Sequence, residues 1–423
     1  MQRMLSKKNH GLLTDVFFCF VIYCLLLTTC GFYFHGTSIA YYGPLAMCVY
    51  LIFTQSRYLS ERAFKTGMLL CAFAFVGSLL AGDEVRSILQ VWAVVFTGVV
   101  VASTMPKEKF MENYCKTMSV LCIASTIIFF VALLAPNAVK LFPQVNTGTD
   151  RAYFIGFSFV RPATRWVAMR NQSIFWEPGC FQTFIVLAFI FEVSRYGNKS
   201  RLRVYSYVIA LITTMSTTGF LALFIAVLIL LFEENSKKKL KGLKFAISLC
   251  FFLILATSIF SFLPKGISNG TFDKINDIIN GKTDNISVTT RINAVVYSLK
   301  SFLKSPLFGV GRSGLIKWGN LNEAGASIMT FTPGNWLGRY GFVFGVTAIL
   351  GLVQWKDKLF ETKIANLLQV LIMILIVSSE AYTTNAVIWI FVFYGLYPRN
   401  RYWVEKTRTE KESKRALLSG TIF

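Results

Sequence analysis

A carboxylate at the start of a long apolar run is the first feature of this sequence that could do chemistry. Glu177 ends the segment from Arg170 to Gly179, which reads RNQSIFWEPG. Proline in a first helical turn is favoured and an acid there meets the positive end of the helix dipole, so Glu177 could simply begin a helix. Beside an arginine, it could equally act as a base or orient a hydroxyl group.

A second candidate region begins with an arginine on a predicted helix. From Thr290 to Lys304 the apolar residues repeat at helical spacing, which predicts an amphipathic helix on a membrane surface, with Arg291 near its start. The segment that follows, Pro306 to Gly314, reads PLFGVGRSG. Gly309, Gly311 and Arg312 there could turn backbone N–H groups and a guanidinium toward an anion, or could form a plain helix-terminating turn.

The elements that position these residues are predicted to be membrane spans. The chain has 423 residues, of which 54% are hydrophobic and 15% charged, and this excludes an ordinary soluble domain. A bilayer core of about 30 Å needs about 20 mostly apolar residues per helix. Uncharged runs bounded by Lys and Arg give twelve candidate spans, at 12–34, 37–54, 66–82, 87–105, 117–135, 179–194, 203–217, 218–233, 245–264, 335–354, 364–380 and 384–398.

Charge alternation supports this count. Lys and Arg gather on every second connection, so the positive-inside rule places both termini in the cytoplasm. The net charge of +22 is then mostly topology, and no nucleic-acid partner is expected. The uncharged stretch 204–232 is short for two ordinary spans, but one span would break the alternation, so two short helices are predicted there. The first apolar stretch lacks a cleavage pattern, which indicates a retained span.

The resulting fold class is all-α, a single polytopic membrane domain over residues 1–423 with about twelve spans. Two long connections, 136–178 and 264–334, fall on the outer face and are expected to contain short amphipathic helices, and 399–423 forms a basic cytoplasmic tail. Long loops in a compact fold are often functional. The cysteines lie in or near spans and no histidine cluster exists, so neither a disulfide framework nor a metal or other cofactor is expected.

Three short motifs, in order along the chain, carry a family resemblance. The segment 170–179 resembles the "R, then (G/S)-I/L-F-x-E-P-(G/S)" segment of bacterial Wzy-type O-antigen and capsule repeat-unit polymerases. Residues 215–221 (MSTTGFL) resemble their polar "S-x-T/S-G" helix. Thr290-Arg291, followed by 305–311 (SPLFGVG), resembles the "S/T-R, then P-L-x-G-x-G" pattern that these polymerases share with the O-antigen ligases.

The resemblance implies a GT-C-like glycosyltransferase of the bacterial inner membrane. Its donor and acceptor are expected to be oligosaccharides linked to undecaprenyl diphosphate, handled on the periplasmic face among membrane lipids, with a chain-length regulator protein as a possible partner. Arginine suits the departing diphosphate because its fork donates two hydrogen bonds and stays charged. The candidate catalytic residues are Glu177, Arg170 and Arg291, with Glu380 and Asp150 as reserve bases. The candidate diphosphate-binding residues are Arg312, Arg161, Arg165, Arg339, Gly309 and Gly311.

Two other functions are open at this point. Ligases of the family are expected to carry a histidine late in the second long loop, whereas this chain has Thr332-Pro333-Gly334-Asn335-Trp336 there and only His10 and His35 in all. This favours a polymerase over a ligase. A flippase of lipid-linked glycans would also suit twelve spans, but no internal repeat is evident and the ionisable groups concentrate in the outer loops instead of at the membrane midplane.

Overall fold

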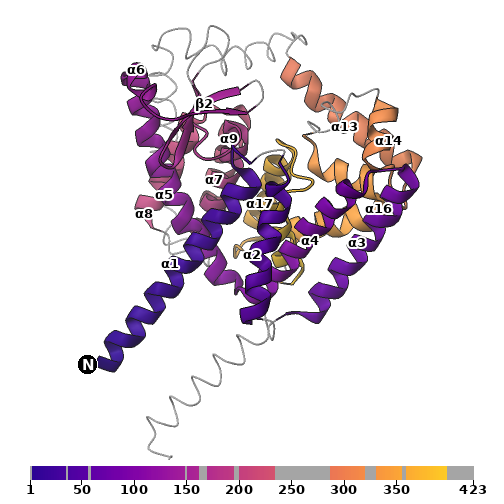
Figure 1. Cartoon of the computed structure of the whole chain (residues 1–423), viewed down its shortest axis with the longest axis horizontal. Coiled ribbons are helices and arrows are strands. Elements are labelled where there is room, and N and C mark those ends of the chain that lie inside the picture. Colours follow the sequence, from indigo (N-terminus) through magenta and orange to yellow (C-terminus); the bar gives the residue numbers. More distant parts are fainter. Residues whose placement is uncertain are drawn as a thin grey trace, which may run out of the picture.

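The computed structural model is predominantly helical (Figure 1). It describes residues 2–34, 37–55, 59–147, 150–161, 169–194, 200–233, 286–319, 330–354 and 359–397. The predicted span 245–264, the predicted tail 399–423 and Arg165 lie outside the described residues. Asp150 begins a strand whose first side chains are likewise outside the description.

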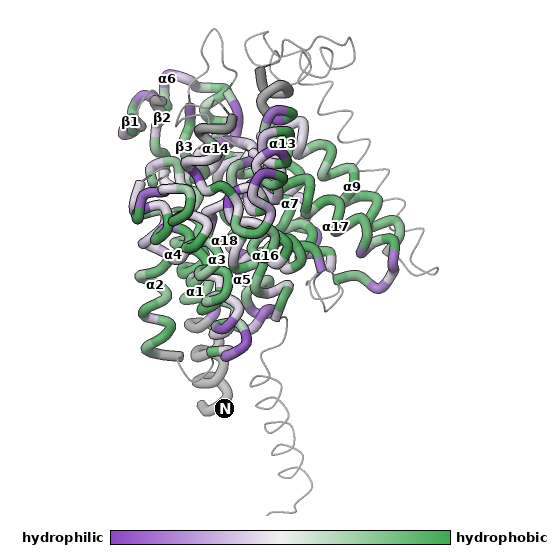
Figure 2. Tube along the Cα trace, turned by 90° about the vertical axis from the view of Figure 1, so that its right-hand side faces the viewer, coloured by the Kyte–Doolittle hydropathy of each residue, from purple (hydrophilic) through white to green (hydrophobic). Residues whose placement is uncertain are grey.

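Eleven of the predicted spans coincide with described helices: α1 (Gln2–Cys30), α2 (Ile39–Gln55), α3 (Glu61–Ala81), α4 (Val85–Thr104), α5 (Lys107–Leu134), α7 (Pro178–Val193), α8 (Arg201–Thr213), α9 (Thr217–Glu233), α16 (Thr332–Gln354), α17 (Lys363–Val377) and α18 (Ala386–Leu396). Among the described residues, α3, α4, α5 and α16 are long and apolar enough to cross a membrane, and six further apolar helices are shorter. Figure 2 shows the apolar character of these helices in green. The chain is a multi-pass membrane protein, and the total of twelve spans stays a prediction.

The short uncharged stretch 204–232 does divide into two helices. α8 ends at Thr213 and α9 begins at Thr217, with a turn between them. Met215 in this turn has a φ of 48°, in the left-handed region that side chains other than glycine rarely adopt. The prediction of two short helices is therefore confirmed, and the turn that joins them is under backbone constraint.

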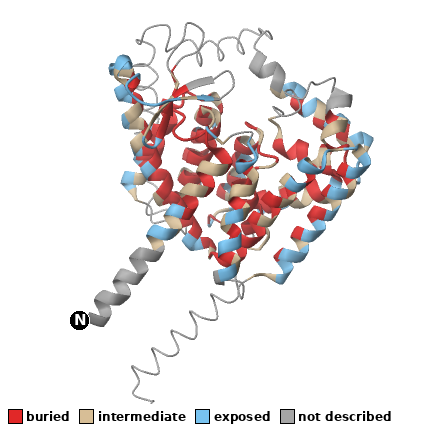
Figure 3. Cartoon of the chain, viewed as in Figure 1, coloured by how far each residue is buried: buried red, intermediate tan, exposed pale blue. Residues whose placement is uncertain are grey.

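Two helices form the centre of the bundle. Almost every residue of α7 and of α18 is buried (Figure 3), and a helix that is apolar on all sides belongs inside its protein. α18 packs between α4 and α16, and α7 packs against α5, α8 and α9. Gly395 of α18 lies against the backbone carbonyl of Gly351 of α16, with no room for a Cβ. Such small residues let membrane helices approach closely, and here they bring the C-terminal part of α18 against α16.

A small antiparallel sheet occupies the first long connection, after the short helix α6 (Pro136–Val139). Strand β2 (Asp150–Ile155) pairs with β1 (Gln144–Thr147) and with β3 (Ser158–Val160). Buried aromatic rings join the sheet to the end of α1, since Phe32 contacts Phe159 with ring centroids 5.1 Å apart. Sequence reasoning predicted amphipathic helices in this loop and did not anticipate the sheet.

The second long connection contains the amphipathic helix that the periodicity predicted. This helix, α13, spans Ile286–Lys304 and is followed by α14 (Gly311–Gly319). α13 packs on α16 (Figure 1) through a narrow face of small residues that includes Ala294, Ser298 and Ser301. The opposite face of α13 exposes Ile292, Val296, Leu299 and Leu303.

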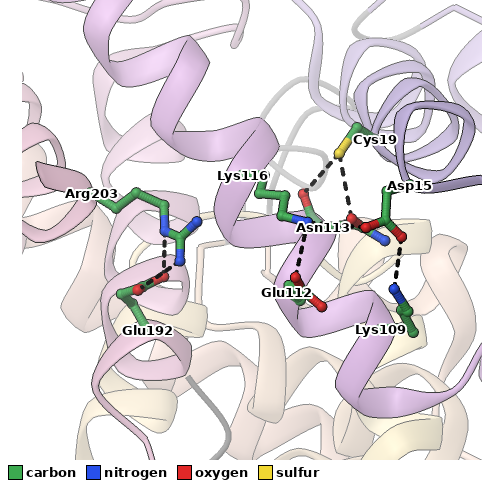
Figure 4. Close-up of polar contacts among 8 residues, drawn as sticks. All are labelled: Asp15, Cys19, Lys109, Glu112, Asn113, Lys116, Glu192 and Arg203. Carbon is green, nitrogen blue, oxygen red and sulfur yellow. Dashed lines mark hydrogen bonds and ion pairs between the residues drawn. The ribbon is translucent and has the colours of Figure 1, made fainter. Parts of the chain in front are cut away.

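Ion pairs join neighbouring helices of the bundle, α1 to α5 and α7 to α8 (Figure 4). The carboxylate of Asp15 in α1 accepts from Lys109 at 2.7 Å and from Lys116 at 3.3 Å, both in α5. Glu192, at the end of α7, accepts from Nε and Nη2 of Arg203 in α8 at 2.9 and 3.0 Å. The Glu192 side chain is 1% exposed and that of Arg203 is 17% exposed.

Loss of the Glu192 charge should destabilise the bundle. In Glu192→Gln the partly buried guanidinium of Arg203 loses its counter-charge, and breaking a buried pair from one side costs about 3 kcal/mol. We expect the detergent-solubilised variant to unfold at a clearly lower temperature than the wild type in a thermal scan. Glu61→Gln is the matched control, because Glu61 pairs with Lys65 on the exposed surface of α3 and should show no change. Equal unfolding temperatures for the two variants would contradict the prediction.

Candidate active site

Glu177 stands at the N-terminus of α7, as its Pro-Gly context predicted. It has extended backbone angles and Pro178 is the first helical residue, but its side chain makes no capping hydrogen bond to α7. The preceding strand-like segment is fixed to the end of α1, since Phe32 N donates to Ile174 O at 2.8 Å and Trp176 N donates to Cys30 O at 3.0 Å. These backbone bonds therefore fix the position of Glu177, while its half-buried side chain makes no capping hydrogen bond to α7.

Arg170 anchors the same segment to the turn between α8 and α9. Its guanidinium donates from Nε to Thr214 O at 2.8 Å and from Nη2 to Met215 O at 3.1 Å. The neighbouring Asn171 donates to the hydroxyl of Thr213 at 2.9 Å and to that of Ser125 at 3.2 Å. These bonds orient Arg170 and leave Nη1 without a bond to these carbonyls.

Arg291 reaches the same place from α13. Its Nη1 donates to the hydroxyl of Thr218, near the start of α9, at 3.3 Å. Since Thr218 belongs to the polar motif at 215–221, Arg291 of the third motif meets this second motif in space, beside Arg170 of the first, although about 120 residues separate Arg170 from Arg291.

Glu380 is the fourth charged member of this cluster. It lies in the connection between α17 and α18 and is 9% exposed. Its backbone carbonyl accepts from the hydroxyl of Thr332 at 2.9 Å, and the same hydroxyl accepts from Tyr382 N at 2.8 Å. α18 itself begins at Asn385, whose side chain caps the helix. From the sequence alone, Glu380 is predicted only as a reserve base.

The four charged side chains act on one another. Burial raises the pKa of Glu380 well above its ordinary value, and the neighbouring carboxylate of Glu177 raises it further, against the opposing influence of Arg291 and Arg170. Burial lowers the pKa of Arg170, which Glu177 and Glu380 oppose. These four residues, Arg170, Glu177, Arg291 and Glu380, form the acid–arginine cluster.

Gly179 provides the space for the Glu380 carboxyl group. A Cβ added to Gly179 would overlap with Oε1 of Glu380, and it would lie 3.7 Å from Oε1 of Glu177. The obstructing atom is the end of a flexible side chain, so alanine should be tolerated by the fold but should displace the Glu380 carboxyl group.

Gly179→Ala should therefore lower activity without lowering abundance. We expect normal membrane levels by immunoblot, with about a tenfold loss of product, since misplacing a group at a reacting centre costs about 10- to 100-fold. Gly43→Ala in α2 is the control, because its nearest neighbours are 3.4 Å from the added Cβ. Normal product from Gly179→Ala would show that the position of Glu380 does not matter.

Arg161 supports the acid–arginine cluster from one side. Its Nη2 donates to the carbonyl of Trp176 at 2.7 Å, and its guanidinium carbon lies 4.9 Å above the centroid of the Phe32 ring. Arg161 thus joins β3, the end of α1 and the residue before Glu177. This contact shows how Arg161 could position Glu177 in addition to contacting an anion.

The glycine-containing segment 306–314 turns backbone amides toward a carboxylate of the chain itself. Arg312 N and Ser313 N donate to Oδ2 and Oδ1 of Asp83 at 2.8 and 2.7 Å. The Asp83 carboxylate thereby caps the start of α14. Gly309 has a φ of 74° and lies against the backbone of Arg339. Because Asp83 already occupies these amides, they need no external anion.

Arg339 lies apart from the acid–arginine cluster, next to a kink in α16 at Gly341. Its guanidinium carbon lies 5.3 Å from the centroid of the Tyr340 ring, and its buried Nε has no hydrogen-bond partner among the described residues. Val310 N donates to Gly338 O at 2.8 Å, and Phe342 N donates to Pro306 O at 2.7 Å. The segment 306–314 is thus docked on the kinked helix α16, and Arg312 and Arg339 lie there, in a different neighbourhood from Glu177.

A comparison with protein families identifies the middle of the chain. Residues 204–353 match the family model described as O-antigen ligase. The chain carries the domain of the Wzy polymerase and O-antigen ligase family. No curated protein matches the chain.

The Wzy polymerase and ligase family consists of membrane enzymes of the glycosyltransferase kind that act on lipid-linked glycans in polysaccharide biosynthesis of the bacterial inner membrane. The matched range contains Thr218, Arg291, Arg312 and Arg339, whereas Arg170 and Glu177 precede it and Glu380 follows it. The acid–arginine cluster therefore combines Arg291 of the matched range with residues from the segment before α7 and from the connection between α17 and α18.

Proposed function

We propose that this protein polymerises oligosaccharide repeat units linked to undecaprenyl diphosphate into O-antigen or capsule polysaccharide. The observation that carries the proposal is the convergence of Arg170 and Arg291 with Glu177 at the start of α7. A glycosyl transfer from a lipid diphosphate needs cations for the leaving group and a base for the incoming hydroxyl group, and this cluster supplies both.

The roles follow from the chemistry of each group. Negative charge develops on the diphosphate as the glycosidic bond breaks, and Arg170 and Arg291 are suited to hold it because their planar forks donate bidentate hydrogen bonds. Glu177, half-buried and unused by its own helix, accepts the proton of the acceptor hydroxyl group. Arg161 positions Glu177. Arg312 and Arg339 keep a proposed contact with diphosphate or lipid head groups elsewhere on the same surface.

The absence of a suitable histidine favours a polymerase over a ligase. The histidines of the chain are His10 and His35, so residues 204–353 contain none, although their family model is described as O-antigen ligase. A transfer mechanism that uses a histidine in the second long loop cannot operate in this chain. The description of the family model nevertheless makes ligase the second candidate.

The proposed setting is the inner membrane of a bacterium, with both termini in the cytoplasm. The sheet β1 to β3, the acid–arginine cluster and α13 then face the periplasm, where lipid-linked units are polymerised. A chain-length regulator protein is a proposed partner. The cluster lies at the opposite end of α7 from Glu192, about 22 Å away along the helix, near the predicted cytoplasmic side.

A deletion strain separates the candidate functions. We expect surface glycan from the deletion strain to run as lipid A core with a single repeat unit, and the full ladder to return when the wild-type chain is expressed. Complete loss of surface repeats would indicate a flippase instead. Lipid-linked polymer that is never transferred would indicate a ligase. Either of these results would overturn the proposed polymerase.

A further inference from the structure

Two carboxyl groups of the acid–arginine cluster lie beside the same residue, Gly179. A Cβ placed on Gly179 would overlap with Oε1 of Glu380 and would lie 3.7 Å from Oε1 of Glu177, so the two carboxyl groups are close neighbours. Like charges this close disfavour double ionisation, and an ionised carboxylate can only accept hydrogen bonds. One proton on the pair removes the repulsion and provides a donor for a hydrogen bond between the two groups.

The surroundings of the two groups differ in a way that assigns the proton. Glu380 is 9% exposed, in the connection that precedes α18, where charge is costly. Glu177 is more exposed and stands at the N-terminus of α7, whose dipole favours an anion. The charged groups that face Glu380 are Glu177, Arg291 and Arg170, and the nearest other titratable groups are Cys180 and Tyr382.

We propose that Glu380 is the protonated member of this pair, and that by donating its proton in a hydrogen bond it holds Glu177 ionised and oriented as the base. The inference rests on the polymerase function proposed above. Glu380 is a positioning residue, because it acts through Glu177. With one negative charge in the pair, the two arginines leave a positive surplus for the diphosphate, whereas a doubly ionised pair would cancel it.

The proton balance of the transfer is simple. The acceptor oxygen forms a bond to the sugar C1 while its proton passes to Glu177, and the bond from C1 to the diphosphate breaks with its electron pair leaving on the diphosphate. Glu380 keeps its proton throughout. Glu177 then returns the proton it has gained to water.

Glu380→Gln tests this assignment, because the amide N–H can replace the carboxyl O–H as donor to Glu177. We expect purified Glu380→Gln to extend lipid-linked single repeat units, extracted from the deletion strain, within about threefold of the wild-type rate at neutral pH, because the hydrogen bond to Glu177 is kept. Glu380→Ala, which lacks a donor, and Glu177→Gln, which lacks a base, should both be strongly impaired. Glu380→Gln as inactive as Glu177→Gln at equal abundance would overturn the proposal.

The pH profile provides a readout that a purely structural role would not move. In the wild type, the rate should fall once the pH rises past the raised pKa of Glu380 and this group loses its proton, because ionisation adds a second negative charge to the pair. Glu380→Gln cannot ionise, so this alkaline fall should be absent. An unchanged alkaline fall in Glu380→Gln would contradict the proposal.

A labelling experiment on the wild type covers the case in which the variants fail to fold. A hydrophobic carbodiimide modifies protonated carboxyl groups, and mass spectrometry should find more adduct at Glu380 than at Glu192 at neutral pH. Glu192 is the matched control, since it is 1% exposed and its carboxylate accepts two hydrogen bonds from the Arg203 guanidinium. More adduct at Glu192 than at Glu380 would overturn the proton assignment. The labelling needs no substrate, so its result tests the proton assignment alone. Failure of the proposed polymerase function would be detected separately, as a missing ladder from the wild type.

Discussion

Glu177→Gln should abolish polymer while the protein remains inserted in the membrane. Removing a general base costs about 10²- to 10⁴-fold in rate, and glutamine keeps the size and hydrogen-bonding capacity of the side chain. Complementation of the deletion strain with Glu177→Gln should give surface glycan with one repeat unit on a gel, at a protein level that matches the wild type by immunoblot.

The control for Glu177→Gln is Glu84→Gln. Glu84 stands at the start of α4 in an exposed position and likewise makes no side-chain capping bond. Glu84→Gln removes the same charge from the connection between α3 and α4, so a normal ladder is expected. A ladder of normal length from Glu177→Gln would remove Glu177 from the chemistry and leave the cluster with a binding role only.

Arg291→Ala should have the second largest effect, a loss of donor use. Its guanidinium is placed by Thr218 beside Arg170 and the two acids, where it faces the proposed diphosphate. A lost hydrogen bond to a charged group costs about 1.5 to 3 kcal/mol, so the rate at low substrate concentration should fall by about 10- to 100-fold. The measurement is the initial rate of ladder formation as a function of lipid-linked substrate concentration.

Arg291→Lys distinguishes bidentate binding of the diphosphate from simple charge attraction as the cause of this loss. Arg291→Lys should restore activity only in part, because an ammonium group is not bidentate. Lys300→Ala is the control, since Lys300 is exposed on the same helix α13 and carries the same charge. If Arg291→Lys restored the full rate, simple charge attraction would replace bidentate binding as the role of Arg291.

Much of the helical framework could be predicted from the sequence because hydrophobic runs and positive charges report directly on membrane insertion. The division between Thr213 and Thr217 followed from charge alternation, and α13 followed from its helical period. The sheet β1 to β3 did not, because it contains short strands in a polar loop, whose pairing depends on contacts such as Phe32 with Phe159.

The members of the site were visible as residue types, but their grouping was not. From the sequence alone, Arg312 and Arg291 were equally good candidates for binding the diphosphate, because both are arginines in the second long outer loop. The structure places the two arginines in different surroundings. The Thr218 hydroxyl group accepts a hydrogen bond from the side chain of Arg291, whereas the Asp83 carboxylate accepts one from the backbone N–H of Arg312. Such a distinction depends on contacts between distant segments, which a single sequence does not encode locally.

Glu380 illustrates the same limit for electrostatics. As an acid between two apolar runs it could be named as a reserve, but its place beside Glu177 and Gly179 arises only from the packing of distant segments of the chain. The partner that raises the pKa of Glu380 lies about 200 residues away in the chain. Its role as a partner of Glu177 could therefore be inferred only from the structure.

Reconstitution with lipid-linked substrate alone tests the proposed polymerase most directly. The purified wild-type chain, in vesicles that contain lipid-linked single repeat units and no lipid A core, should produce a ladder of products spaced by one repeat unit. Glu177→Gln in the same vesicles should leave the single units unchanged. If the wild type formed no ladder until lipid A core was added, and then only transferred glycan to it, the protein would be a ligase and the proposed polymerase would be wrong.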